Sequence, residues 1–241
     1  MWSSHPSFEI PADNTVLWNF MSTEKFLSLI TSCQLNLARV DQFDDPWEGS
    51  ITQGTADAIN ANWGVAAPQS LDLLKQSLAR FRKRAFASCW HMNDHESAAM
   101  WDLYARRNAG VAIRTSIKSL KNSLVCTEEL FVGRVNYKDY SAHVVDMNMY
   151  SHILLKRKSF EHEQELRIIY FEPQVSGTPV LAESASRFKR IPVQLDVLLE
   201  RVSIAPMAPA WHLTAIRDAA VALRLPPELF TQSNLYNPSV V

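Results

Sequence analysis

Glycine is scarce in this sequence, and its scarcity excludes two large classes of nucleotide-binding protein. Six glycines occur in 241 residues, well below the usual share of about 7%. None are spaced for the G-x-G-x-x-G fingerprint of Rossmann folds. The nearest approach to a P-loop runs from Gly49 to Gly54, but Thr55 follows it where a P-loop needs the lysine that contacts the phosphates. Any nucleotide must therefore be bound by side chains instead of loop amides.

Long apolar runs, a leader peptide and paired cysteines are also lacking. No run reaches the ~18 apolar residues that cross a bilayer, and residues 1–6 lack the basic and apolar regions of a signal peptide. Cys33, Cys89 and Cys126 form no C-x-x-C pair, which suits a reducing compartment. A formal net charge of −1 leaves no overall footprint for duplex nucleic acid or anionic lipid. We therefore expect a cytoplasmic protein that does not associate with membranes.

Length and hydrophobic content predict a single domain over 1–241, or two closely packed lobes. Residues 15–20 form an apolar segment typical of a strand, and the next apolar residues, from Phe26 to Cys33, have helical spacing. Strand and helix patterns intermix without a regular period. This favours an α+β fold with a mixed or antiparallel sheet and flanking helices. The stretch of about 50–84 is predicted to be a helical insertion.

The densest polar cluster lies at residues 160–170. Because side chains alternate along a strand, Glu163, Glu165 and Arg167 are predicted to share one face. Two adjacent acids raise each other's pKa while an arginine lowers it, which is how a catalytic acid or an orienting carboxylate is tuned. The alternative is an exposed strand start with a cross-strand ion pair. The basic run at 156–158 just before it predicts a solvated face.

A second acidic group occupies the segment 43–48, where Asp44, Asp45 and Glu48 surround Trp47. Such a loop can bind a cation or the hydroxyls of a ribose. The alternative is an Asx turn, in which the aspartates accept their own backbone amides.

His91 and His95 are four residues apart, a spacing that can place two imidazoles on one helical face for a metal. Asn93 and Asp94 between them are typical helix caps. That places His91 before the helix, at a strand terminus, where it is better suited to hydrogen bonding a ligand. We predict no metal site.

Several aromatic residues lie beside polar ones. These tryptophans offer stacking surfaces for a flat base or, alternatively, belong to the core: Trp18, Trp47, Trp90 and Trp101. Residues 96–105 are predicted to form a helix that buries Met100, Trp101 and Tyr104. No G-x-S-x-G or H-E-x-x-H pattern is present, which removes those hydrolase classes.

These motifs together resemble a widespread bacterial family of unknown function, the domain-of-unknown-function family numbered twenty-nine seventy-one. The resemblance spans nearly the whole chain. Its motifs are Leu17-Trp18-Asn19-Phe20, Phe43-Asp44-Asp45-Pro46-Trp47-Glu48, Ser88-Cys89-Trp90-His91, Glu96-Ser97-x-x-Met100-Trp101-x-x-Tyr104, Gly110-Val111-Ala112-Ile113 and Lys158-x-Phe160-Glu161-His162-Glu163-x-Glu165-x-Arg167.

The layout is also similar to that of ADP-ribosyltransferases, which hold NAD in a cleft without a Gly-rich loop. An opening strand and helix, a second strand ending at Arg39, and a glutamate beginning a later apolar strand carry this resemblance. It implies Glu165 as the catalytic glutamate that stabilises an oxocarbenium-like ribose. It further implies that Trp18, Asn19 and Phe20 flank the nicotinamide, that Arg39 contacts phosphate, and that Tyr104 or Trp101 stacks.

The leading hypothesis is thus an ADP-ribosyltransferase-like enzyme acting on NAD or another nucleotide, in phage defence or a toxin system, with a protein or nucleic acid as acceptor. The catalytic candidates are Glu165, Glu163, His91 and Arg167. The candidates for substrate binding are Trp18, Asn19, Phe20, Arg39, Asp44, Asp45, Glu48, Trp90, Trp101 and Tyr104.

Two alternatives stay open. One is a metal-assisted phosphodiesterase or nuclease that uses Asp44, Asp45, Glu163, Glu165 and His91. The other is a non-catalytic module that binds a nucleotide or a protein partner through its acidic and aromatic residues.

Overall fold

The structure is a computed structural model that describes residues 2–146, 148–173 and 184–237. It has the α+β fold that the sequence predicts, with helices and a mixed sheet. The chain divides into two compact units. Unit 1 comprises residues 1–10, 36–89 and 127–189, and unit 2 comprises 11–35, 90–126 and 190–241. Each unit is therefore assembled from three separated stretches of sequence.

Unit 1 is built on an antiparallel pair, β6 (Leu130–Arg134) with β9 (Glu165–Phe171), in register from Leu130↔Tyr170 to Arg134↔Leu166. Strand β9 neighbours β4 (Ala85–Met92), whose first part pairs antiparallel with β3 (Gln34–Arg39). The other strands with residues in this unit are β1 (Trp2–Ser3), β7 (Asn136–Lys138), β8 (Leu155–Arg157) and the start of β10 (Phe188–Pro192). Strands β7 and β8 form a separate parallel pair.

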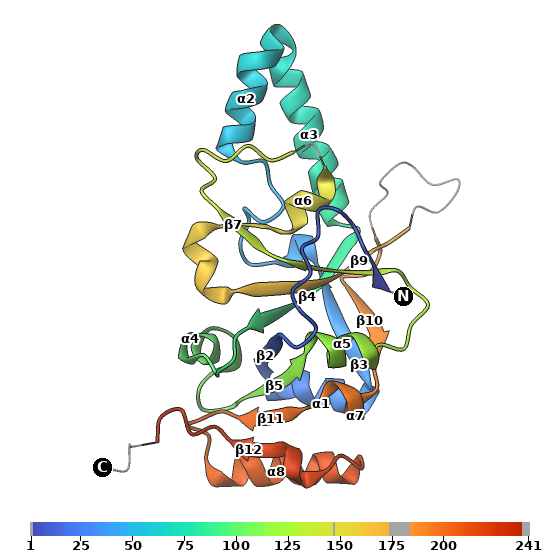
Figure 1. Ribbon diagram of the computed structural model, residues 1–241, viewed down its shortest axis with the longest axis vertical. Coiled ribbons are helices and arrows are strands. Elements are labelled where there is room, and N and C mark those ends of the chain that lie inside the picture. Colours follow the sequence, from blue (N-terminus) through green and yellow to red (C-terminus); the bar gives the residue numbers. More distant parts are fainter. Residues whose placement is uncertain (1, 147, 174–183, 238–241) are drawn as a thin grey trace. The chain divides into compact units, whose positions relative to one another are not determined.

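Two long helices of unit 1, α2 (Gln53–Trp63) and α3 (Ala67–Arg82), pack together as a hairpin (Figure 1). They lie within the stretch 50–84 that the sequence predicts to be helical. Thr52 begins α2, because its hydroxyl accepts a hydrogen bond from the amide of Thr55. The shorter helical segments of this unit are Val40–Gln42, Gly64–Ala66, α6 (Met149–Ile153) and Lys158–Glu163.

Unit 2 is built on a seven-residue antiparallel ladder between β2 (Val16–Ser22) and β5 (Gly110–Ser116). The end of β4 pairs with β2, and β11 (Arg201–Ile204) pairs antiparallel with β5. The remaining elements of this unit are β12 (Phe230–Gln232), α1 (Thr23–Ser32), α4 (Ala98–Met100), a π-helical turn (Trp101–Ala105), α5 (Ile117–Ser123), α7 (Leu195–Leu198), α8 (Ala210–Ala222) and a short turn (Pro227–Leu229).

Aromatic side chains fill the core of each unit. In unit 1, Phe8, Phe81 and Phe131 pack with β9. In unit 2, Trp18, Phe20 and Trp101 are buried together, and the Phe20 and Trp101 rings meet edge to face at 5.1 Å between centroids. Burial of this kind identifies Trp18 and Trp101 as core, the second of the two roles that the sequence leaves open for them, and Phe20 belongs to the same core.

The helix predicted for 96–105 is partly wrong. The structure has one short helix, α4, which a π-helical turn extends from Trp101 to Ala105. Met100 and Trp101 are buried as predicted, but Tyr104 is 47% exposed. The wider turn changes the direction of the side chains that follow it, since a π-helix closes its hydrogen bonds over five residues instead of four.

Gly110 permits a close approach of β5 to this turn. A Cβ atom at Gly110 would lie 1.8 Å from the carbonyl oxygen of Ala105, which is a backbone atom. We therefore expect Gly110→Ala to lower the free energy of unfolding by about 1–3 kcal/mol, measured by urea denaturation. Gly133→Ala is the matched control, because its Cβ would meet the end of the Leu154 side chain at 2.5 Å instead of a backbone atom. A larger loss at position 133 than at 110 would show that the approach is not tight.

Candidate functional site

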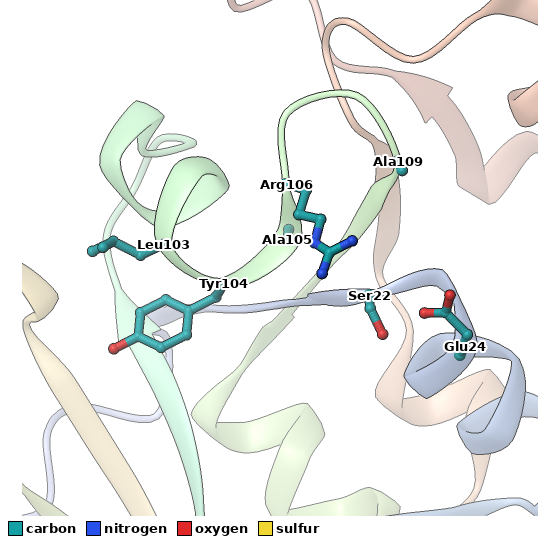
Figure 2. A pocket seen from close by; sticks show the side chains of 7 residues that line it. All are labelled: Ser22, Glu24, Leu103, Tyr104, Ala105, Arg106 and Ala109. Atoms are coloured by element: carbon teal, nitrogen blue, oxygen red, sulfur yellow. The ribbon is translucent and has the colours of Figure 1, made fainter. Parts of the chain in front are cut away.

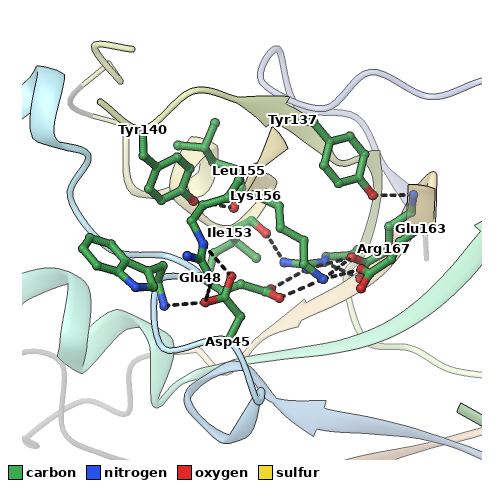
Figure 3. A network of polar contacts seen from close by, with 12 residues as sticks. Asp45, Glu48, Tyr137, Tyr140, Ile153, Leu155, Lys156, Glu163 and Arg167 are labelled. Atoms are coloured by element: carbon green, nitrogen blue, oxygen red, sulfur yellow. Dashed lines mark hydrogen bonds and ion pairs between the residues drawn. The ribbon is translucent and has the colours of Figure 1, made fainter. Parts of the chain in front are cut away.

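Five charged side chains meet in the interior of unit 1, and Figure 3 shows the network of polar contacts around them. We call them the charge cluster, and its members are Glu48, Lys156, Glu163, Glu165 and Arg167. None is more than 5% exposed. They come from the loop before α2, from β8, from the turn Lys158–Glu163 and from β9. Segments more than a hundred residues apart in sequence therefore supply one buried ionic group.

Arg167 is held on both edges of its guanidinium group. Its Nε donates to Oε1 of Glu165 at 2.8 Å, and Nη2 donates to Oε2 of Glu165 at 2.9 Å and also to Glu48. Its Nη1 donates to the carbonyl oxygen of Ile153 at 2.6 Å. A bidentate pair of this geometry fixes the Glu165 carboxylate in position as well as in charge.

Lys156 gathers the three carboxylates around one ammonium group. Its Nζ lies 3.0 Å from Oε1 of Glu48 and 3.4 Å from Oε2 of Glu165, and it also donates to Glu163. The cluster thus contains three carboxylates and two cations among the described residues. With all five side chains ionised, its formal charge is −1.

The opposite charges in the cluster keep one another ionised, although burial alone disfavours the charged form of each side chain. Burial alone would raise the pKa of Glu165, but the charge and hydrogen bonds of Arg167, with the charge of Lys156, hold it at about 2. Burial would lower the pKa of Lys156, yet Glu165 and Glu48 raise it above its ordinary value. Burial, with a smaller contribution from Glu165, raises the pKa of Tyr137, whose hydroxyl oxygen accepts a 2.8 Å hydrogen bond from the Glu165 amide. Glu165 is therefore a carboxylate throughout the neutral range.

A partly exposed surface borders the cluster. We call it the aromatic rim, and it consists of Trp47, Arg157 and Phe160. The Arg157 guanidinium carbon lies 5.8 Å from the Trp47 ring centre and 5.2 Å from that of Phe160. Phe160 also lies 5.0 Å from Nζ of Lys156, so it connects the rim with the cluster. Trp47 is 49% exposed.

The Asp45 carboxylate holds two residues of the aromatic rim in position. This buried carboxylate accepts a 3.0 Å hydrogen bond from Nη2 of Arg157 and a 3.1 Å bond from the backbone amide of Trp47. The second bond is the Asx turn that the sequence leaves open as an alternative. Asp45 therefore orients both rim residues, while Asp44 beside it is exposed.

Arg39 has a supporting role in unit 1. Its Nε and Nη2 donate to Asp41 at 2.6 and 3.1 Å, and its Nη1 donates to the carbonyl oxygen of Ser184 at 2.7 Å. The guanidinium group thus binds a carboxylate and a backbone carbonyl, whereas the resemblance to ADP-ribosyltransferases implies a phosphate contact.

The other predicted site residues lie in unit 2. Trp18, Phe20, Trp90, His91 and Trp101 are buried, and Asn19 is half-buried on β2. Two of their polar atoms bond within the unit, because Nε1 of Trp18 donates to the carbonyl oxygen of Asn93 at 2.9 Å and Nε1 of Trp101 donates to Glu96 at 3.1 Å. His91 Nε2 lies 3.3 Å from the Asn93 side-chain nitrogen. The predicted residues thus gather in two groups, one in each unit.

Three acidic residues that the nuclease hypothesis names, Asp45, Glu163 and Glu165, form ion pairs with cations of the chain itself. Within residues 2–146, 148–173 and 184–237, no group of three His, Cys, Asp or Glu side chains is arranged to hold a metal ion. Glu163 and Glu165 face Lys156 and Arg167 instead. Across the same residues, no helix is long and apolar enough to span a bilayer.

Sequence reasoning missed Lys156, Arg157 and Phe160. Lys156 belongs to a run of three basic residues, which usually marks a solvated face, and its buried position depends on Glu48, far away in sequence. The one local signal is the glutamates seven and nine residues after it.

No family model, curated protein or solved structure matches the chain.

Proposed function

We propose that the chain acts on a nucleotide, with NAD as the leading candidate, in the manner of an ADP-ribosyltransferase. The nucleotide binds on the aromatic rim, and its glycosidic bond breaks beside the charge cluster. Nicotinamide leaves with the bonding electrons, and a nucleophile of a protein or nucleic-acid acceptor, or water where no acceptor is present, bonds to the ribose carbon. The observation that supports this most strongly is the combination of an exposed tryptophan and a guanidinium with a buried ionic group of net negative charge. The similarity of the layout to ADP-ribosyltransferases extends the proposal to a role in phage defence or a toxin system.

The rim has the side chains that a glycine-poor chain needs for a nucleotide. A half-exposed indole offers a face on which a base can stack, and such stacking is worth about 1–3 kcal/mol. Arg157 supplies a planar cation suited to a phosphate. Because Asp45 already holds the Arg157 side chain and the Trp47 backbone in place, these residues lose little conformational entropy when a ligand binds.

The cluster has the charge that glycosidic cleavage needs. When nicotinamide leaves, positive charge develops on the ribose, and a fixed negative group in a buried site stabilises that charge. Glu165 stays ionised because its pKa is about 2. Both of its oxygens are bonded to Arg167. We therefore assign Glu165 an electrostatic role within the cluster instead of a direct bond to the ribose.

A non-catalytic nucleotide-binding module is the second candidate. The observation that favours it is the pairing of Glu165 with Arg167 and Lys156, because a carboxylate held in this way can belong to a group that only stabilises the fold. The two candidates share the binding surface and differ in whether the glycosidic bond breaks.

Trp47→Ala tests the binding surface. We expect about tenfold weaker binding of NAD, since loss of one stacking face removes about 1–3 kcal/mol. Isothermal titration calorimetry measures the two affinities. Trp63→Ala is the matched control, because Trp63 lies on α2 of the same unit and is 48% exposed, almost the same as Trp47. No NAD binding by the wild type, or equal affinities for all three proteins, would contradict the proposed surface.

A further inference from the structure

A second candidate site lies in unit 2, and it does not depend on the nucleotide proposal. A pocket of about 370 Å³ opens between the end of β2, the start of α1 and the π-helical turn (Figure 2). Its volume is within the range of about 300–1,000 Å³ that small-molecule sites occupy. Its polar and bulky lining residues are Ser22, Glu24, Leu103, Tyr104 and Arg106, and two alanines complete it.

Partly buried hydrogen bonds hold the walls of this pocket. Beneath the turn, the Glu96 carboxylate accepts hydrogen bonds from Nε1 of Trp101 and from the hydroxyls of Ser203 and Ser233. On the other side, the Thr23 hydroxyl donates to the carbonyl oxygen of Ala109 at 2.5 Å. The pocket is therefore formed before any ligand arrives, which lowers the entropic cost of binding.

The lining combines two opposite charges with an apolar wall. Glu24 and Arg106 come from different elements, and Figure 2 shows both side chains beside the same opening. Leu103 and Tyr104, both about half exposed, form the apolar part. A ligand that suits this wall carries an ammonium group, a carboxylate and an apolar body.

We propose that this pocket binds a free α-amino acid with an aromatic or large aliphatic side chain. The ammonium group of the ligand faces Glu24, its carboxylate faces Arg106, and its side chain packs against Leu103 and Tyr104. The three groups of such a ligand radiate from one carbon atom, as the two charges and the apolar wall surround one opening.

Three related probes test this assignment by calorimetric titration. L-phenylalanine carries both charges, 3-phenylpropanoate lacks the ammonium group and phenethylamine lacks the carboxylate. We expect the wild type to bind phenylalanine about fivefold more tightly than either of the others, which is the effect of one exposed charge contact. No binding of phenylalanine at millimolar concentration would overturn the proposal.

Two variants then identify the residues. Glu24→Gln should weaken phenylalanine about fivefold but leave 3-phenylpropanoate unchanged, and Arg106→Gln should weaken phenylalanine but leave phenethylamine unchanged. Lys25→Gln is the control, because Lys25 is exposed on the same turn of α1 but is not among the residues that line the pocket. Equal effects of all three variants, or no effect of the first two, would overturn the assignment. Since all three side chains are exposed, thermal melting should confirm that each variant is folded.

Discussion

Arg167→Met is expected to lower the free energy of unfolding by about 3–5 kcal/mol, the usual cost of removing one partner from a buried ion pair. Methionine fills much of the same volume, so the loss comes from charge and hydrogen bonding. Without Arg167, Glu48 and Glu165 stay buried with one cation fewer, and the carbonyl oxygen of Ile153 loses its donor. Urea denaturation followed by circular dichroism measures the change.

Arg107→Met is the matched control for that experiment. Arg107 also forms an ion pair, with Asp102, but the two side chains are 51% and 37% exposed. Exposed pairs contribute about 0–1 kcal/mol. Equal losses for the two variants, or a loss below about 1 kcal/mol for Arg167→Met, would show that the charge cluster does not hold unit 1 together.

Acid should destabilise the wild type more than Glu165→Gln. The folded pKa of Glu165 is about 2, below its ordinary value of 4.5. Its contribution is therefore complete above pH 4.5 and is lost as the pH falls through the folded pKa. The full contribution is about 3 kcal/mol, and about 2 kcal/mol of it should vanish between pH 7 and pH 3. The variant lacks this titration.

The measurement compares the free energy of unfolding at pH 7 and pH 3, at one ionic strength, for the wild type and Glu165→Gln. The control is Glu161→Gln, because Glu161 is an exposed residue of the turn before β9 and should keep the wild-type pH profile. Parallel profiles for the wild type and Glu165→Gln would mean that Glu165 is not held by its neighbours.

The sequence predicts three of the five members of the charge cluster. The alternation of side chains along a strand brings Glu165 and Arg167 together, and β9 has this pattern. Glu163 joins them from the turn before the strand instead of from the strand itself. Glu48 and Lys156 could not be assigned to this group, because their position depends on tertiary contacts between distant segments. The spacing of residues within one segment does not predict such contacts.

For the aromatic residues, the sequence identifies the candidates but not which of them are exposed. A tryptophan beside polar residues is compatible with a stacking surface and with a core, and sequence does not distinguish them. Trp18 and Trp101 are core because other elements of unit 2 cover them, whereas Trp47 stays exposed on an Asx turn. Tyr104 lines the pocket because it lies on a π-helical turn. No residue pattern in this segment predicts such a turn.

Release of nicotinamide from NAD tests the central claim most directly. The folded protein is incubated with NAD that is labelled in the nicotinamide ring, alone and with protein, DNA and RNA as acceptors, and free nicotinamide is counted. We predict release by the wild type and by Trp63→Ala, and strongly reduced release by Trp47→Ala. Binding of NAD without release would leave only the non-catalytic module. Neither binding nor release by the folded wild type would contradict the account of this site.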